Sequence, residues 1–193
     1  MTSQPPPVHF PAPSRPRAVC VFTGSSPGLR DCYLETARAL GRALARRGVT
    51  LVYGGAHCGL MGAVADAALA GGGRVVGVRP RALVAREVAH QGLSELIITE
   101  DMHTRKARMA ALADGFLALP GGYGTLEELF EVITWSQLGL HRKPIGLLDS
   151  GGFWGGLQAF LAHTRTEGFI PAGGLAVLPS ETDPERMLDL LAV

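Results

Sequence analysis

Short apolar runs alternate with glycine-rich loops and helical segments along most of this chain, and that repeat limits the possible folds more than any other feature. Apolar runs of about four or five residues, without polar alternation, are typical of strands buried on both faces. We expect such strands at 18–22, 50–53, 75–78, 96–98, 116–119, 145–148 and 176–178. Helices are predicted at about 31–47, 62–70, 104–113, 126–138 and 153–166, with a last helix after Asp183-Pro184.

Strands and helices in regular alternation predict an α/β fold, a single-domain Rossmann-like structure with a mainly parallel sheet flanked by helices. A length of 193 residues suits one hydrophobic core. Residues 1–16 are rich in proline and are expected to form a flexible tail, because proline neither continues a helix nor donates to a strand ladder. The folded domain is therefore predicted at 17–193.

The composition gives no support for nucleic-acid or membrane partners. The formal net charge is +1, from 18 basic and 17 acidic residues, so charge gives no reason to expect nucleic acid or an anionic membrane. No signal sequence or membrane span is visible. The three cysteines show no paired metal-ligand spacing, which favours a reducing compartment. We expect a cytoplasmic protein that acts on a small molecule.

Glycine-rich loops follow the first, second and fifth predicted strands, at 24–28, 54–62 and 121–125. In a parallel sheet these loops meet at the carboxyl edge, where ligands bind. A helix that starts behind such a loop offers free N–H groups to a phosphate. None of the loops has the spacing of a P-loop or of the dinucleotide fingerprint, which favours a mononucleotide. Tight turn geometry alone also explains glycine after a strand.

Two polar patterns have a structural and a functional interpretation. Thr125 and Glu128 have the spacing of a helix capping box, in which each side chain bonds the other's backbone amide. Arg105 and Lys106 stand near the start of a predicted helix, where the dipole disfavours cations. A cationic pair in that position indicates an anionic partner, such as a phosphate or a carboxylate.

Together these residues carry a family resemblance. Pro120 to Glu128 has the form P-G-G-x-G-T-x-x-E, and Arg105-Lys106 forms the R-K signature that precedes it. The stretches 53–62 and 131–135 match as well. On these motifs the chain resembles the LOG family, the cytokinin riboside 5′-monophosphate phosphoribohydrolases, historically mislabelled lysine decarboxylases. The resemblance extends over about 17–170.

The resemblance implies hydrolysis of the N-glycosidic bond of an adenine-type nucleoside 5′-monophosphate, either a cytokinin riboside monophosphate or AMP, to free base and ribose 5-phosphate. It implies a homodimer with no metal and no cofactor, and Arg105 and Glu128 as the catalytic pair. With the glycine-rich loops included, the residues expected to contact the substrate are Gly24, Ser25, Gly54, Gly55, Glu87, Met102, Arg105, Lys106, Gly121, Gly122, Tyr123, Gly124, Thr125, Leu126, Glu127, Glu128 and Thr134.

The sequence departs from the family at Ala56-His57-Cys58, which is bulkier than usual, and at Arg79, where an apolar residue is common. A decarboxylase using pyridoxal phosphate is disfavoured, because it needs a Schiff-base lysine and the chain has only Lys106 and Lys143. The alternative that stays open is a non-catalytic carrier of a nucleotide or of the molybdenum cofactor on the same fold. Arg105 and Glu128 together favour the enzyme.

Overall fold

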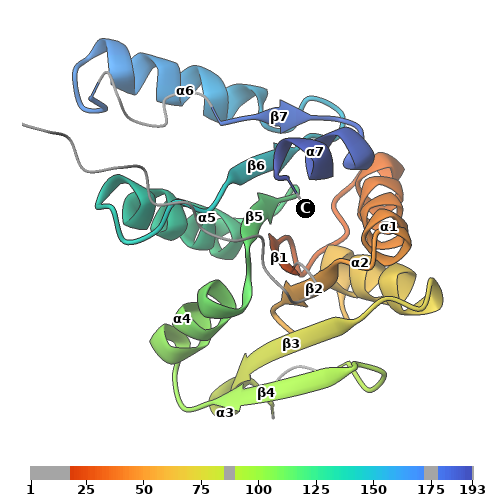
Figure 1. Ribbon diagram of the computed structural model, residues 1–193. Helices are drawn as coiled ribbons and strands as arrows, with labels where there is room; N and C mark the ends of the chain where they lie inside the picture. The colour runs from red at the N-terminus through yellow and green to blue at the C-terminus, as the bar shows by residue number, and fades with distance from the viewer. Residues whose placement is uncertain (1–17, 85–89, 172–177, 193) are drawn as a thin grey trace, which may run out of the picture.

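The computed structural model describes residues 18–84, 90–171 and 178–192. Within them, parallel strands form one sheet in the order β4-β3-β2-β1-β5-β6-β7 (Figure 1). This confirms the α/β prediction. The strands are β1 (Ala18–Phe22), β2 (Thr50–Tyr53), β3 (Val75–Pro80), β4 (Glu95–Thr99), β5 (Gly115–Ala118), β6 (Ile145–Leu148) and β7 (Ser180–Glu181).

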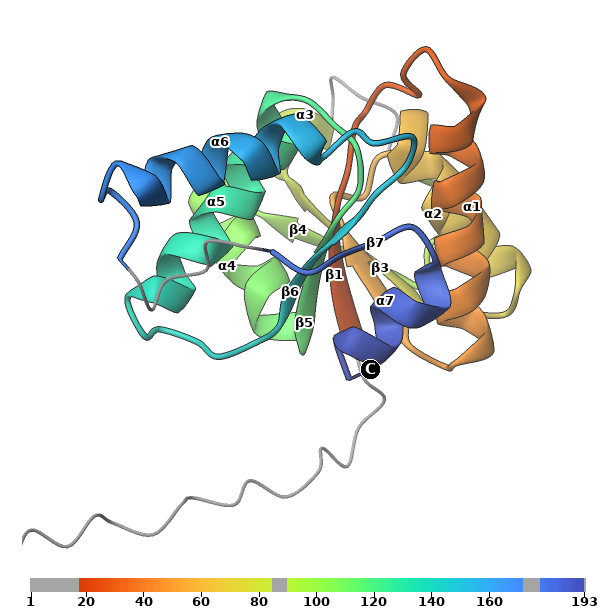
Figure 2. The ribbon, with the colours of Figure 1, turned by 90° about the horizontal axis from the view of Figure 1, so that it is seen from above.

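Helices cover both faces of the sheet. They are α1 (Asp31–Arg46), α2 (Gly59–Ala70), α3 (Arg81–Val84), α4 (Met102–Leu112), α5 (Tyr123–Gln137), α6 (Gly155–Thr166) and α7 (Pro184–Leu190). Helices α1, α2 and α7 lie on one face, and α4, α5 and α6 lie on the other (Figure 2). In β1, Val19 and Val21 join the first core and Cys20 and Phe22 join the second, so the continuous apolar run reflects burial on both sides.

Several predicted boundaries were wrong. Helices α2, α4 and α5 begin two or three residues earlier than the apolar periodicity indicates, because their first turns are glycine-rich or polar and lie at the sheet edge. The short helix α3 was not predicted. Of the last predicted strand, 176–177 lies outside the described residues, and Leu178 precedes β7. The predicted tail at 1–16 also lies outside the described residues.

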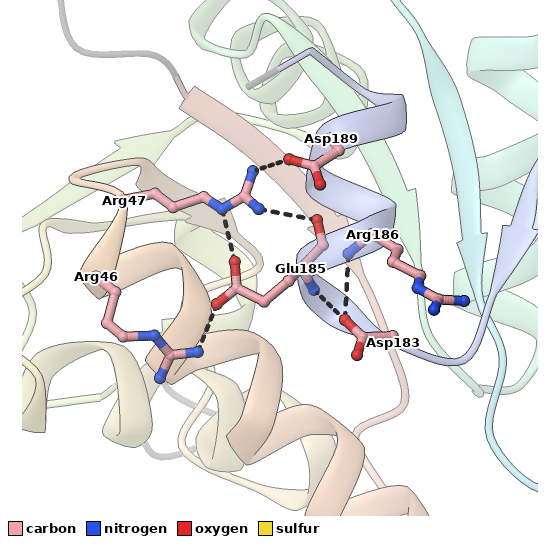
Figure 3. Close-up of polar contacts among 6 residues, drawn as sticks. All are labelled: Arg46, Arg47, Asp183, Glu185, Arg186 and Asp189. Atoms are coloured by element: carbon pink, nitrogen blue, oxygen red, sulfur yellow. Dashed lines mark hydrogen bonds and ion pairs between the residues drawn. The ribbon is translucent and has the colours of Figure 1, made fainter.

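The last helix is held against α1 by ion pairs, as Figure 3 shows. Arg46 Nη2 lies 2.5 Å from Glu185 Oε1, and Arg47 Nε lies 2.7 Å from Glu185 Oε2. These two guanidinium groups lower the pKa of Glu185. Asp183 accepts hydrogen bonds from two first-turn amides of α7, with Pro184 at the first helical position, which confirms the predicted cap.

Two further properties concern the compartment. Among the described residues, no helix is both long enough and apolar enough to span a bilayer. Cys20, Cys32 and Cys58 are free thiols. The cytoplasmic location stays a prediction.

Helices α1 and α2 pack closely at Gly41. A Cβ atom there would lie 2.4 Å from the Val64 carbonyl oxygen and 2.8 Å from the Ala67 Cβ. Gly41→Ala should therefore lower the free energy of unfolding by about 1–3 kcal/mol, despite the better helix propensity of alanine. Urea unfolding measures this. The matched control is Gly156→Ala in α6, where no atom lies within 4 Å of the added Cβ, and stability should stay equal or rise. Equal losses in both variants would contradict the close packing.

Candidate active site

The three glycine-rich loops meet at the carboxyl edge of β1 and β5, where the strand order changes direction. Gly24 joins them: its N–H donates to the Pro120 carbonyl at 3.1 Å, and its carbonyl accepts from the Leu60 N–H at 3.1 Å. This topological switch point is where open parallel sheets bind ligands. The predicted convergence of the loops is confirmed.

Close packing requires glycine at two positions in these loops. A Cβ at Gly59, whose φ is +56°, would lie 2.4 Å from the Ser25 carbonyl group. A Cβ at Gly121 would lie 2.1 Å from Thr125 Oγ1. Turn geometry alone therefore does not account for the glycine at 121; the space above α5 is filled by the buried Thr125.

A cavity of about 270 Å³ opens between the loops and the starts of α4 and α5. It contains both predicted catalytic side chains. Its lining is Thr23, Gly24, Ser25, Gly54, Ala56, Met61, Arg79, Met102, Arg105, Gly122, Tyr123, Gly124, Thr125, Glu127 and Glu128.

The start of α5 forms one wall of this cavity. Gly122 is the N-cap and provides no side-chain cap, and the first intrahelical bond runs from the Leu126 N–H to the Gly122 carbonyl. The amides of Tyr123, Gly124 and Thr125 come before that bond, so they are the donors a helix start offers to an anion. The capping-box interpretation was wrong. Because the helix begins at Tyr123, Thr125 is already in its first turn and Glu128 lies one turn further in.

Arg105 and Glu128 form a buried ion pair within the cavity. Arg105 Nη1 lies 2.7 Å from Glu128 Oε1, and the two side chains are 10% and 12% exposed. Arg105 Nε donates to the Val78 carbonyl at 3.0 Å. A Cβ on Gly54 would lie 2.5 Å from Arg105 Nη2, so the guanidinium group rests on the second glycine loop. Three elements thus fix the orientation of the arginine toward the carboxylate.

Burial raises the pKa of the Glu128 carboxyl group, and the charge of Arg105 and its hydrogen bond offset only part of that effect. A carboxyl group perturbed by burial and by a specific charge partner in a cleft is a feature of catalytic sites. The ion pair can hold a carboxylate at a defined position while keeping it more basic than an exposed glutamate.

Lys106 points elsewhere. Its Nζ pairs with Glu127 and lies 3.0 Å from Glu131 Oε1, and the residue does not line the cavity. The predicted contact of Lys106 with substrate therefore has no support in the geometry. The sequence placed Arg105 and Lys106 together, but adjacent residues on a helix face about 100° apart.

Four other predicted contacts lie outside the cavity lining. Leu126 is partly buried and packs against the core, and Thr134 is exposed, with its hydroxyl donating to the Phe130 carbonyl at 2.7 Å. Gly55 packs against the Arg79 side chain, and Gly121 lines a neighbouring pocket. Glu87 lies outside the described residues.

The cavity also includes four residues that were missing from the predicted contacts, namely Thr23, Ala56, Met61 and Arg79. Ala56 and Arg79 stood out as departures from the family, and Arg79 is 1% exposed at the end of β3. Thr23 follows β1 directly, and its hydroxyl donates to the Pro120 carbonyl at 3.3 Å. The sequence feature that could have identified Thr23 as a site residue is its position directly after a predicted strand.

A Rossmann-like sheet with an open helix start and a buried arginine–carboxylate pair in a cavity at its switch point has the features of an α/β enzyme with a small-molecule site. Comparison with known proteins gives the family. The family model described as possible lysine decarboxylase matches residues 61–191. The cytokinin riboside 5′-monophosphate phosphoribohydrolase LOG7 of Arabidopsis thaliana is 47% identical over 175 residues, covering 91% of this chain and 81% of the relative.

A phosphoribohydrolase of the same description from Rhodococcoides fascians is 53% identical over 156 residues, covering 80% of this chain and 79% of that protein. The molybdenum cofactor binding protein of the phototrophic bacterium Rippkaea orientalis shares the fold, with a TM-score of 0.70, 21% identity, and coverage of 93% of this chain and 98% of that one. The chain belongs to the LOG family and is an enzyme of the phosphoribohydrolase type.

The homodimer stays a prediction. Leu138 and Leu140 at the end of α5 are each 69% exposed, which suits an interface, whereas Trp135 packs against the core.

The buried pair and its neighbour Lys106 allow a matched test of stability. Arg105→Met leaves Glu128 buried without its cation and should lower the free energy of unfolding by about 3 kcal/mol. Lys106→Met removes pairs whose carboxylates are 54% and 22% exposed, and should cost at most about 1 kcal/mol. Chemical denaturation of both variants checks the order, and a larger loss for Lys106→Met would contradict it.

The raised pKa of Glu128 gives a pH-dependent stability. A carboxyl group with a raised folded-state pKa stabilises the fold fully below its unfolded pKa, and that contribution is lost as pH rises through the folded pKa. We expect the unfolding free energy of the wild type minus that of Glu128→Gln to decrease from about pH 4 to pH 8. Denaturant titrations across this range measure it. A difference that grows with pH would show that Arg105 outweighs burial.

Proposed function

We propose that the protein hydrolyses the N-glycosidic bond of cytokinin riboside 5′-monophosphates, and of AMP, to give the free base and ribose 5-phosphate. One observation carries the proposal: the buried Arg105–Glu128 pair and the open start of α5 share one cavity. The names of the relatives from Arabidopsis thaliana and Rhodococcoides fascians support the same reaction.

The 5′-phosphate would bind at the start of α5. Tyr123, Gly124 and Thr125 line the cavity at the helix start, where free amides and the helix dipole favour negative charge. Ser25, near the start of the first loop, adds a hydroxyl to the same cavity. An anchored phosphate fixes the position of the ribose, which converts binding energy into orientation of C1′.

Glu128 would act at C1′. About one helical turn, a rise of roughly 5 Å, separates the phosphate-binding amides from the carboxylate, which a ribose ring can bridge. Departure of the base leaves positive charge on C1′ and the ring oxygen, and a nearby carboxylate stabilises that charge or takes a proton from the attacking water. The C1′–N bond breaks, water oxygen joins C1′, and a proton goes to the departing base. The hydrogen bond from Arg105 holds the Glu128 carboxylate in its orientation.

The lysines provide an argument against a decarboxylase that works through a Schiff base. The chain has two lysines, and neither lines the cavity. Lys106 pairs with Glu127 and Glu131, and Lys143 Nζ donates to the Ala110 carbonyl at 2.7 Å. The site residues therefore supply a carboxylate and an arginine, and no amine for pyridoxal phosphate.

The test is release of base from isopentenyladenosine monophosphate and from AMP, followed by chromatography. Glu128→Gln should lower kcat at least about 100-fold, since it removes the reacting carboxylate, while AMP binding is retained. Glu131→Gln is the matched control: it lies one turn further along α5 and pairs with Lys106 outside the cavity. Its kcat should stay near that of the wild type.

Two outcomes would overturn the proposal. Binding of the nucleotides by the wild type without release of base, at high enzyme concentration, would favour the carrier alternative. Equal loss of kcat in both variants would show that neither carboxylate reacts at C1′.

A further inference from the structure

Two histidines and an aspartate gather on the outer side of the second glycine loop. His57 belongs to that loop, Asp66 to α2, and His90 follows the undescribed stretch before β4. One ligand atom from each, an imidazole nitrogen or a carboxylate oxygen, lies within 4.8 Å of those of the other two. Their cluster, called here the His57–Asp66–His90 cluster, is separate from the active site, since none of the three lines the catalytic cavity.

A hydrogen bond explains part of this arrangement. His90 is 6% exposed, and its Nε2 lies 2.8 Å from Asp66 Oδ1. The Gly92 N–H donates to His90 Nδ1 at 3.1 Å, so the ring proton is on Nε2 and is donated to Asp66. This hydrogen bond is enough to account for a buried histidine beside a carboxylate.

That hydrogen bond does not account for the position of His57. Its Nδ1 approaches the same Asp66 oxygen at 3.9 Å, which is too long for a hydrogen bond. The two imidazole rings meet edge to face with centroids 4.7 Å apart. The side chains of His57 and Asp66 are each 55% exposed, so an ion in solution can reach two of the three ligands.

We propose that the His57–Asp66–His90 cluster binds a divalent transition metal ion, with Zn²⁺ as the best match. Zinc bonds of about 2.0–2.2 Å at tetrahedral angles set ligand atoms about 3.3 Å apart. The observed separations of 2.8 Å and 3.9 Å lie on either side of that value. The ion would replace the proton between His90 and Asp66, and water would take the fourth position.

The donor set selects the kind of ion. Two imidazole nitrogens and one carboxylate oxygen suit Zn²⁺, Co²⁺ or Ni²⁺, whereas Mg²⁺ and Ca²⁺ prefer oxygen donors. When His90 Nε2 ligates the metal, its proton moves to Nδ1, which then no longer accepts from the Gly92 amide. Gly92 is exposed, so water can take over that amide.

Metal binding at this cluster would act on the active-site loop. His57 follows Ala56, which lines the catalytic cavity, and the His90 N–H donates to the Gly55 carbonyl at 3.2 Å. An ion bound by both His57 and His90 would therefore restrict the motion of the second glycine-rich loop.

Calorimetric titration of the tag-free protein with ZnCl₂ tests the site. We expect one ion per chain, with the affinity lowered at least about tenfold in His57→Ala and in Asp66→Asn. The exposed His57 makes the first variant safe for folding. His163→Ala is the matched control, because His163 Nδ1 also lies 3.9 Å from a carboxylate, that of Glu167, on the exposed face of α6. Its affinity should equal that of the wild type.

Cobalt reports the ligands directly. Co²⁺ added to the wild type should give the visible bands of a tetrahedral site, and these should be absent from His57→Ala. Zn²⁺ should raise the Tm of the wild type and not that of His57→Ala, because binding to the folded state stabilises it. No binding by the wild type, or equal binding by His57→Ala, would overturn the proposal. A thiolate charge-transfer band would also overturn it, because it would assign the ion to the exposed Cys58.

Discussion

The ion pair between Arg105 and Glu128 is the interaction on which the site depends. It joins α4 to α5 across the end of the sheet, and Arg105 also donates a hydrogen bond to the Val78 carbonyl of β3. A buried pair is costly to desolvate, so it persists only where the geometry satisfies both partners. Gly54 leaves room for the guanidinium group, which a side chain at that position would displace. The pair thus explains a glycine in a loop far from it in sequence.

One helix provides both halves of the proposed chemistry. The start of α5 leaves its first amides without a side-chain cap, and the same helix carries Glu128 one turn later. An uncapped helix start is a loss for stability and a gain for anion binding. The carboxylate stands behind the amides, where burial raises its pKa and the arginine holds its position. Phosphate and reacting centre would therefore be placed by one rigid element.

Two activities are attached to the names in this family, and the positions of the two lysine side chains distinguish between them. The matching family model is described as possible lysine decarboxylase, whereas the relatives compared above are called phosphoribohydrolases. Both lysines of this chain are held outside the cavity, one by carboxylates and the other at a backbone carbonyl. A protein described as binding the molybdenum cofactor shares this fold, so the fold by itself does not define the ligand.

The sequence by itself determined the α/β class, the glycine-rich loops at one edge and the Arg105–Glu128 candidates, since apolar runs report burial and motifs report local backbone demands. It misplaced the start of α5 and left a capping box open as one interpretation of Thr125 and Glu128, because helix starts carry no apolar periodicity. Only the tertiary structure decided which side chains share the cavity. It directed Lys106 away and brought Thr23 and Arg79 in. Strand order and helix rotation set those neighbours, and both depend on contacts between residues far apart in the chain.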